Sequence, residues 1–296
     1  MSGRRFYIVD VFAEARYAGN QLCVVRDSQD LAVREMQQIA REFNYSETTF
    51  ILSQTPRAGG YDVRIFTPRE EVPFAGHPTL GTAFIIQQEL IAAPVEEVTL
   101  NLKVGRIPVT LSYDAGRVDM LWMKQKTPEF GPFLPGDLLA GLLGLQPEQL
   151  DPEFPVQEVS TGLPFVIVPL NGLAAVRQAR LNPNRYPEGT GRARTGAVLC
   201  FSRETYDPEN QLHVRVFADH YGVPEDPATG SANGCLAAYL LRHGYFGPGV
   251  VTARVEQGYE IGRPSLLRLN AEDDDGVITV RVGGRVIPVA RGELVQ

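Results

Sequence analysis

The chain has 296 residues, which suits one large domain or two of about 150 residues each. It is 44% hydrophobic and 21% charged, as expected for a globular protein with a full core. A formal charge of −7, without a basic stripe, argues against a nucleic-acid partner. No apolar run reaches the roughly 18 to 20 residues of a membrane span, and the first residues lack a secretion signal. We therefore expect a cytoplasmic protein with no membrane contact.

Neither the cysteines nor the histidines form a pattern typical of a metal site. The three cysteines include no CxxC pair, which predicts buried reduced thiols rather than disulfides or a zinc knuckle. They are Cys23, Cys200 and Cys235. His213, Asp219 and His220 lie close in sequence but lack further ligands at defined spacing, so we expect no metal.

The first half of the chain predicts short strands around two helices. Its β-branched and aromatic runs are bounded by turn residues, at 6–12, 22–25, 48–52 and 61–66. Between the second and third runs, "LAVREMQQIAREF" (31–43) has apolar residues at helical spacing. A second helix is expected to begin near His77 or Pro78.

The second half repeats this order. "GLPFVIV" (162–168) corresponds to "GNQLCVV" (19–25), and "LHVRVFADH" (212–220) corresponds to "YDVRIFTP" (61–68). "ATGSANGCLAAYLL" then stands where "FAGHPTLGTAFII" stood, with Gly230 opposite Gly76, 154 residues earlier. Such ordered repetition predicts a duplicated unit.

The predicted fold class is α+β, with two similar lobes related by a pseudo-two-fold axis and joined by the proline-rich stretch 126–137. Each lobe is expected to be a mixed sheet wrapped around a central helix. We place the N-terminal lobe at 1–128 and the C-terminal lobe at 129–296, and allow the last strand to pack on the N-terminal lobe. Ligand sites favour a cleft between such lobes.

Each repeat has a glycine before a helix, at Gly76 and Gly230. Main-chain N–H groups and the helix dipole attract anions there, which favours a small carboxylate ligand, although an ordinary helix cap fits the same residues. His77 suits a general acid or a hydrogen-bond donor to substrate, or a helix-start residue bonded to the backbone. Asp226 and Ser231 flank the second corner; an Asx-turn and an N-cap account for them equally well.

Glu47 is the candidate base. It stands at the polar start of an otherwise apolar strand, where a dry wall raises a carboxyl pKa toward that of a usable base; the alternative is an exposed strand-end glutamate. The sequence contains no GxSxG, HExxH, P-loop or GxGxxG motif that would indicate competing chemistry.

Four blocks of the sequence closely resemble the PhzF-like proteins of phenazine biosynthesis. They are "DVFAEARYAGNQLCVV", "NYSETTFIL", "IFTPREEVPFAGHPTLGTA" and "EDPATGSANGCLAAYL", and the likeness continues through essentially the whole chain. The resemblance implies the duplicated fold of diaminopimelate epimerase, a homodimer, and catalysis without metal or organic cofactor. The family archetype isomerises trans-2,3-dihydro-3-hydroxyanthranilate.

The resemblance also implies roles for individual residues. Glu47 matches the family's acid/base glutamate, which moves a proton between two carbons of a cyclic diene. His77, Asp226 and Ser231 match residues that hold the polar groups of the substrate and assist proton movement. The substrate carboxylate would bind the main chain around Gly76 and Gly230. Asn20 is a further candidate substrate-binding residue, in a turn that reads Gly-Asn-Gln here and often Gly-Asn-Pro in the family.

Epimerases of this fold carry a cysteine before each of these glycines, where this chain has Ala75 and Thr229. Because neither side chain can be a thiolate, a two-thiol racemase is excluded. The sequence therefore predicts a cofactor-independent isomerase of a small carboxylate-bearing, cyclic diene or amino-acid-like metabolite. The alternatives are an epimerase or tautomerase of an amino-acid derivative, and a non-catalytic metabolite-binding protein.

Overall fold

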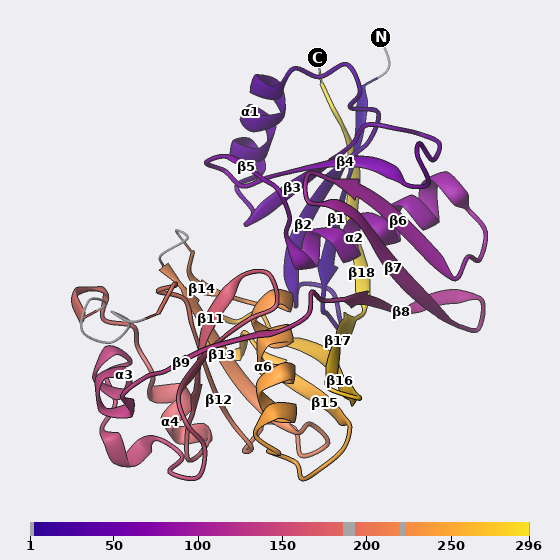
Figure 1. Cartoon of the computed structure of the whole chain (residues 1–296). Helices are drawn as coiled ribbons and strands as arrows, with labels where there is room; N and C mark the ends of the chain where they lie inside the picture. The colour runs from indigo at the N-terminus through magenta and orange to yellow at the C-terminus, as the bar shows by residue number, and fades with distance from the viewer. Residues whose placement is uncertain (1–2, 186–192, 220–222, 296) are drawn as a thin grey trace. The chain divides into compact units, whose positions relative to one another are not determined.

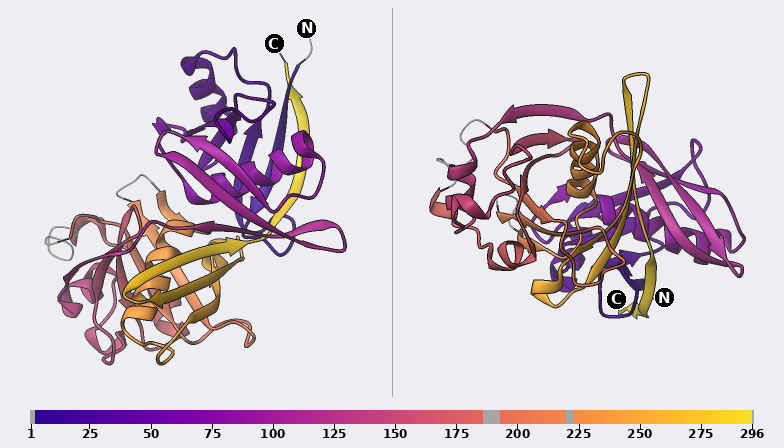
Figure 2. Two further views of the ribbon diagram at one scale, coloured as in Figure 1. Left: turned by 45° about the vertical axis from the view of Figure 1, so that its right-hand side comes forward. Right: turned by 90° about the horizontal axis from the view of Figure 1, so that it is seen from below.

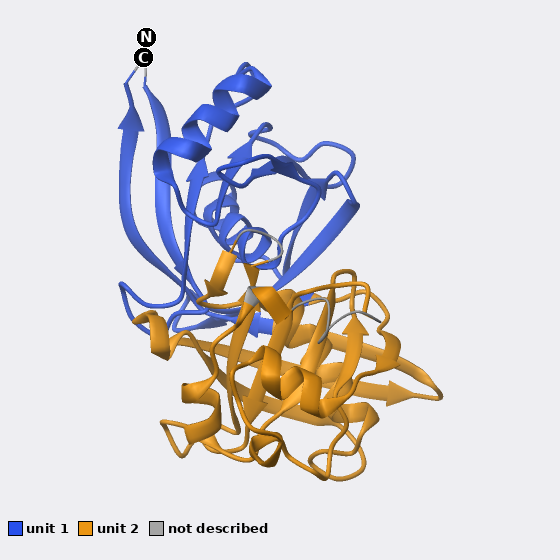
Figure 3. Ribbon diagram, turned by 90° about the vertical axis from the view of Figure 1, so that its left-hand side faces the viewer, with its two compact units in different colours: residues 1–123, 283–296 blue, residues 124–282 orange. Residues whose placement is uncertain are grey.

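The computed structural model describes residues 3–185, 193–219 and 223–295. They form two compact units, one of residues 1–123 with 283–296 and one of residues 124–282 (Figure 3). We call these unit 1 and unit 2.

Unit 1 combines an antiparallel-rich sheet with two helices and one turn of π-helix. Its helices are α1 (Val33–Phe43) and α2 (Gly76–Ile86), with the π-helical turn at Gln87–Ile91. Its strands are β1 (Arg4–Val11), β2 (Asn20–Val25), β3 (Glu47–Ile51), β4 (Tyr61–Phe66), β5 (Glu71–Val72), β6 (Glu97–Leu102), β7 (Gly105–Asp114), β8 (Arg117–Lys124) and β18 (Val286–Leu294).

Helix α2 is the centre of unit 1. Every residue from His77 to Ile86 is buried, and the helix contacts β1, β2, β3, β6, β7 and β18 (Figure 1). A helix that is apolar on all sides is stable only when the protein surrounds it completely. Here the sheet bends around it.

Gly81 lets α2 approach the sheet closely. A Cβ at this position would lie 2.5 Å from Cδ2 of Leu22 and 2.9 Å from Cγ2 of Val11. Deeper along the same helix, the hydroxyls of Thr82 and Thr49 lie 2.8 Å apart, which satisfies two buried polar groups.

Unit 2 has the same kind of architecture around α6 (Gly230–Arg242), where Gly230 and the run from Ala232 to Leu240 are buried. Its other helices among the described residues are α3 (Gly136–Leu142) and α4 (Leu173–Gln178), with 3₁₀ turns at Pro147–Gln149, Pro183–Arg185 and Tyr259–Ile261. Its strands are β9 (Glu129–Phe133), β10 (Gln157–Ser160), β11 (Pro164–Pro169), β12 (Val198–Ser202), β13 (Leu212–Ala218), β14 (Val223–Asp226), β15 (Val251–Gln257), β16 (Ser265–Asp274) and β17 (Val277–Gly284).

The strand pairings confirm the predicted duplication. In unit 1, β2 is parallel to β3, β3 antiparallel to β4, β4 parallel to β6, and β6 antiparallel to β7. In unit 2, β11, β12, β13, β15 and β16 pair with one another in the same sequence of directions. The predicted α+β fold class, a mixed sheet around a central helix in each half, is therefore confirmed.

The last strand belongs to unit 1. β18 pairs antiparallel with β1, Val286 opposite Val11 and Leu294 opposite Arg4, and the two strands run side by side in both views of Figure 2. β1 is thus held between β18 and β2.

Among the described residues, no helix is long and apolar enough to cross a membrane. Each of the three cysteines is a free, buried thiol, as predicted: Cys23 in β2, Cys200 in β12 and Cys235 in α6.

Replacement of Gly81 by alanine should destabilise the protein by about 1–3 kcal/mol, because the new methyl group overpacks the contact with Leu22 and Val11. Urea unfolding at unchanged m-value would measure the loss. Gly141→Ala is the matched control in α3, because the methyl group there meets the flexible end of Arg185 and gains helix propensity. Equal stability of Gly81→Ala and the parent would contradict the close approach.

Candidate functional site

Glu47 and His77 lie together within unit 1. Glu47 is the first residue of β3, and His77 is in the first turn of α2. Nε2 of His77 lies 3.4 Å from Oε2 of Glu47, and both atoms are buried. The side chain of Glu47 is only 18% exposed, so it is not the solvated strand-end glutamate that was the alternative. Two candidate residues 30 positions apart in the chain thus form one pair.

The pair contains a neutral histidine. Burial lowers the pKa of His77 to about 3, although a hydrogen bond to the main-chain carbonyl of Gln21 opposes this shift. The 3.4 Å contact would be an ion pair only with a protonated ring, and desolvation of this ring disfavours that form. Since Nε2 has no hydrogen bond, the N–H given to Gln21 is on Nδ1, and Nε2 presents a lone pair to Glu47.

The turn before β2 places Asn20 and Gln21. Gly19 has φ +67°, and a Cβ there would lie 2.4 Å from the carbonyl oxygen of Val11, so the turn requires glycine. Asn20 follows as the buried first residue of β2. Gln21, where the family often has proline, supplies the carbonyl that accepts from His77. Because proline has the same carbonyl, the departure leaves this contact intact.

The first turns of both central helices lack a side-chain cap. Ala75 is the N-cap of α2 and Thr229 that of α6, and neither side chain accepts a hydrogen bond from the following amides. The N–H groups of Gly76 and Gly230 therefore open each helix without a capping side chain, as an anion-binding turn requires.

Asp226 and Ser231 lie on either side of the Thr229–Gly230 corner of unit 2. Asp226 is the last residue of β14, and the hydroxyl of Thr229 donates a 2.5 Å hydrogen bond to its Oδ2. Ser231 is in the first turn of α6 and does not cap it, since Thr229 holds the N-cap position. The corner thus brings a carboxylate and a hydroxyl to a helix N-terminus.

Gln257 is a residue of this corner that the sequence analysis missed. It is fully buried at the end of β15, and its amide bonds to Asp226, Thr229 and Asn233. The signal that could have found it is the internal repeat. Strand registers align Gln257 with Leu102, so a buried amide stands where the other half has an apolar side chain.

The thiols of this chain cannot replace the missing epimerase cysteines. Burial raises the pKa of the Cys200 and Cys235 thiols to about 12, and that of Cys23 is raised for the same reason. None of them stands at the N-cap of a central helix, where Ala75 and Thr229 are found.

A second ionisable cluster lies in unit 2 around His213 in β13. Nδ1 of this ring lies 3.2 Å from Oε2 of Glu256, and Nε2 lies 3.0 Å from Oε1 of Glu260. Tyr206 and Tyr259 both pack edge-on to the ring. Burial lowers the pKa of His213, but the two carboxylates more than offset it, so the pKa is raised. This cluster of one imidazole and two carboxylates contains none of the predicted site residues.

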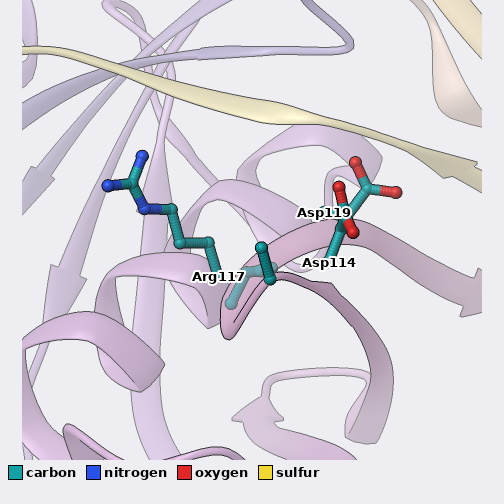
Figure 4. A pocket seen from close by; sticks show the side chains of 5 residues that line it. Asp114, Arg117 and Asp119 are labelled. Atoms are coloured by element: carbon teal, nitrogen blue, oxygen red, sulfur yellow. The ribbon is translucent and has the colours of Figure 1, made fainter.

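Two open surface pockets contain none of the predicted site residues. One, of about 370 Å³, lies at the β7–β8 hairpin beside Asp114, Arg117 and Asp119. Figure 4 shows Arg117 pointing away from the two aspartates. Arg285 binds Asp119 at 2.8 Å, so this carboxylate already has a structural partner. The second pocket, of about 520 Å³, lies beside Arg177, Tyr206 and Glu260.

In the part of the chain that the structure describes, no three histidine, cysteine or acidic side chains converge on a point that could hold a metal ion. His220, mentioned above with His213, lies outside the described residues.

Comparisons with known proteins agree with this fold. The family model described as phenazine biosynthesis-like protein matches residues 9–292. A trans-2,3-dihydro-3-hydroxyanthranilate isomerase of Pseudomonas chlororaphis is 37% identical, over 98% of this chain and 99% of its own. An uncharacterized isomerase of Mesorhizobium japonicum is 35% identical over 99% of both chains. The crystal structure of a PhzF-family protein of Bacillus anthracis covers 100% of both chains, with a TM-score of 0.91 and 27% identity.

The relatives that match almost the whole chain are named isomerases, and this chain is an isomerase. The chain belongs to the PhzF-like family of phenazine biosynthesis-like proteins. The family resemblance read from the four sequence blocks is thereby confirmed.

The burial of His77 predicts an imidazole that is neutral near pH 7. In ¹⁵N NMR spectra, His77 should not titrate above about pH 5, because its pKa is lowered to about 3. In the same spectra His213 should titrate above its ordinary value and His243, whose pKa is lowered by burial, below it. Single histidine variants give the assignments. A titration of His77 near its ordinary value would contradict the neutral pair.

The cluster around His213 predicts a pH-dependent contribution to stability. The pKa of His213 is raised in the folded protein. Its contribution to the free energy of unfolding is therefore complete below about pH 6.5 and is lost as the pH rises through the folded-state pKa. His213→Asn should lose about 3–5 kcal/mol near pH 6, because two buried carboxylates then lack their cation. In urea unfolding, the difference from the parent should narrow toward alkaline pH.

His243→Asn is the matched control for this measurement. The pKa of His243 is lowered in the folded protein, so its contribution to the free energy of unfolding is lost as the pH falls. The difference in this free energy between His243→Asn and the parent should therefore narrow toward acidic pH. A His213→Asn difference that stays constant with pH would show that the ring acts only by packing.

Proposed function

We propose that this chain is a cofactor-independent isomerase that moves a proton between two carbons of a small carboxylate-bearing substrate, with Glu47 as the single acid/base group. The observation that supports this most directly is the buried 3.4 Å contact between Oε2 of Glu47 and Nε2 of a neutral His77. A carboxylate at the start of a strand, beside a neutral ring, suits a group that takes up a proton and then releases it.

In the proposed reaction, the Glu47 carboxylate removes a proton from one carbon of the substrate. The carboxylic acid so formed can donate a hydrogen bond to the lone pair on Nε2 of His77. Because the pKa of His77 is near 3, the ring accepts this bond without taking the proton. The proton therefore remains on Glu47 and is returned to a second carbon of the same substrate, so no net acid or base is consumed.

His77 acts in this scheme as a fixed hydrogen-bond partner. Its Nδ1–H donates to the carbonyl of Gln21, which holds the ring in one tautomer. We assign substrate binding to Asn20 beside it and to the main chain around Gly76. In unit 2 we assign catalytic assistance to Asp226 and substrate binding to Gly230 and Ser231.

The names of the relatives support a substrate class. Several of them are named trans-2,3-dihydro-3-hydroxyanthranilate isomerase, and we therefore propose a carboxylate-bearing cyclic diene as the first candidate substrate. A helix N-terminus such as that at Gly230 suits the carboxylate of such a molecule. The family resemblance also leads us to propose a homodimer.

Glu47→Gln should slow turnover by at least about 10²-fold, because the amide cannot accept the substrate proton. Incorporation of solvent deuterium into trans-2,3-dihydro-3-hydroxyanthranilate, followed by NMR, measures this step. Glu42→Gln, an exposed change in α1, is the matched control and should exchange at the parent rate. Exchange by Glu47→Gln at the parent rate would refute the single-glutamate mechanism.

The same assay separates the alternatives. An epimerase would yield both configurations at the reacting carbon, whereas one base on one face yields a single configuration. A binding protein would be stabilised thermally by the carboxylate ligand without converting it, since ligand binding alone raises stability.

A further inference from the structure

The side-chain amide of Gln257 makes four hydrogen bonds at the Asp226–Gly230 corner. Nε2 donates to the main-chain carbonyl of Asp226 at 2.7 Å and to Oγ1 of Thr229 at 3.0 Å. Oε1 accepts from the main-chain N–H of Thr229 at 3.1 Å and from Nδ2 of Asn233 at 2.9 Å. Both amide protons and both lone pairs of this fully buried side chain are therefore used.

The orientation of this amide is fixed by the main chain. The carbonyl of Asp226 can only accept and the N–H of Thr229 can only donate, so a flipped amide would lose both bonds. The side-chain amide of Asn233 is also fixed in one orientation, because its Nδ2 donates to the main-chain carbonyl of Thr229, which can only accept.

The fixed amide determines what the Thr229 hydroxyl does. Oγ1 accepts a hydrogen bond from Nε2 of Gln257, and its only hydrogen points to Oδ2 of Asp226, 2.5 Å away. This distance is typical of a hydroxyl that donates to an ionised carboxylate. A donor held in this way stabilises the charged form of the acid.

We propose that Gln257 is a positioning residue of the site: through Thr229, it directs a permanent hydrogen bond to Asp226 and holds that side chain as an ionised acceptor. This inference deepens the proposed function, in which Asp226 contacts substrate. It also gives Thr229 a use: at the position where epimerases of this fold carry a thiol, this chain carries a hydroxyl that orients its neighbour.

The backbone after Gln257 supports this arrangement. Gly258 has φ +79°, and a Cβ there would lie 2.5 Å from the carbonyl oxygen of Pro227 and 2.4 Å from that of Arg263. Only glycine allows the end of β15 to pack this closely against the segment that follows Asp226. In unit 1 the corresponding strand ends in Leu102, and the corresponding N-cap is Ala75. Unit 1 therefore has no counterpart of the Gln257 amide or of the Thr229 hydroxyl.

The other charged groups near the corner are engaged elsewhere or lie on neighbouring segments. Glu225, beside Asp226 on β14, binds Arg215 of β13 at 2.7 Å. Glu256, beside Gln257 on β15, binds His213 of β13 at 3.2 Å. Arg263 follows the 3₁₀ turn, and its main-chain N–H donates to the carbonyl of Gly258. These charges are retained in each variant below.

The test is the pKa of Asp226, measured by NMR of ¹³C-labelled aspartate carboxyl groups in the full chain and assigned with Asp226→Asn. Thr229→Val should raise this pKa by about one unit, because the donor to the carboxylate is lost. Thr229→Ser retains the hydroxyl and should keep the parent value. An unchanged pKa in Thr229→Val, or an equal rise in Thr229→Ser, would overturn the proposal.

Gln257→Met tests the amide itself. It should raise the pKa of Asp226 in the parent but add nothing in the Thr229→Val background, because the amide acts through the hydroxyl. An equal shift in both backgrounds, or no shift in the parent, would contradict the proposal. If this variant does not fold, hydrogen exchange in the parent decides: both Nε2 protons of Gln257 should exchange slowly, and fast exchange would refute the bonds.

Activity provides an independent readout. Under the proposed function, Thr229→Val should lower kcat more than it raises KM, and Thr229→Ser should restore kcat. If the proposed isomerisation is wrong, Glu47→Gln and the parent will show equal exchange while the Asp226 pKa still shifts. If only the role of Gln257 is wrong, Glu47→Gln will be inactive and the pKa of Asp226 will be the same in Gln257→Met as in the parent.

Discussion

The complete burial of α2 is the constraint on which unit 1 depends. Since a sheet surrounds this helix from His77 to Ile86, its first turn is also removed from water. A histidine in that turn is therefore neutral, and a glutamate beside it faces a lone pair rather than a cation. The environment of Glu47 thus follows from the packing of the helix, to which Gly81 contributes through its close approach to Leu22 and Val11.

The two units share one architecture but carry different side chains at the start of the central helix. Both place a glycine at the start of a buried helix, but the residue before it is Ala75 in one and Thr229 in the other. In unit 1 the neighbouring strand β3 supplies a carboxylate beside the helix. In unit 2, β15 supplies the Gln257 amide instead. The two halves thus differ at the N-terminal turn of each central helix, while the strand order around it is retained.

The fold could be predicted from the sequence because its signals are local and repeated. The strand at 61–66 was placed at its observed bounds, and the helix near His77 begins at Gly76, one residue earlier than expected. The matching order of runs in the two halves was sufficient to reveal the duplication.

The site could be predicted only as a set of separate residues. The contact of Glu47 with His77 depends on how β3 packs beside α2, which no local pattern specifies. The Gln257 network was missed because a glutamine at the end of a strand is usually an exposed residue. In the sequence, His213 was considered only as a metal ligand, whereas two glutamates from a later segment make it the centre of a buried ionisable cluster.

The pairing of β18 with β1 has a consequence for the order of assembly. Unit 2 is one continuous stretch of chain, whereas unit 1 is made of residues 1–123 and 283–296. During synthesis from the N-terminus, every residue of unit 2 leaves the ribosome before β18 does. The sheet of unit 1 therefore stays incomplete, with one edge of β1 unpaired, while the 159 residues of unit 2 are synthesised. An unpaired strand edge favours association with other chains, so the incomplete half is exposed to such association until β18 pairs with β1.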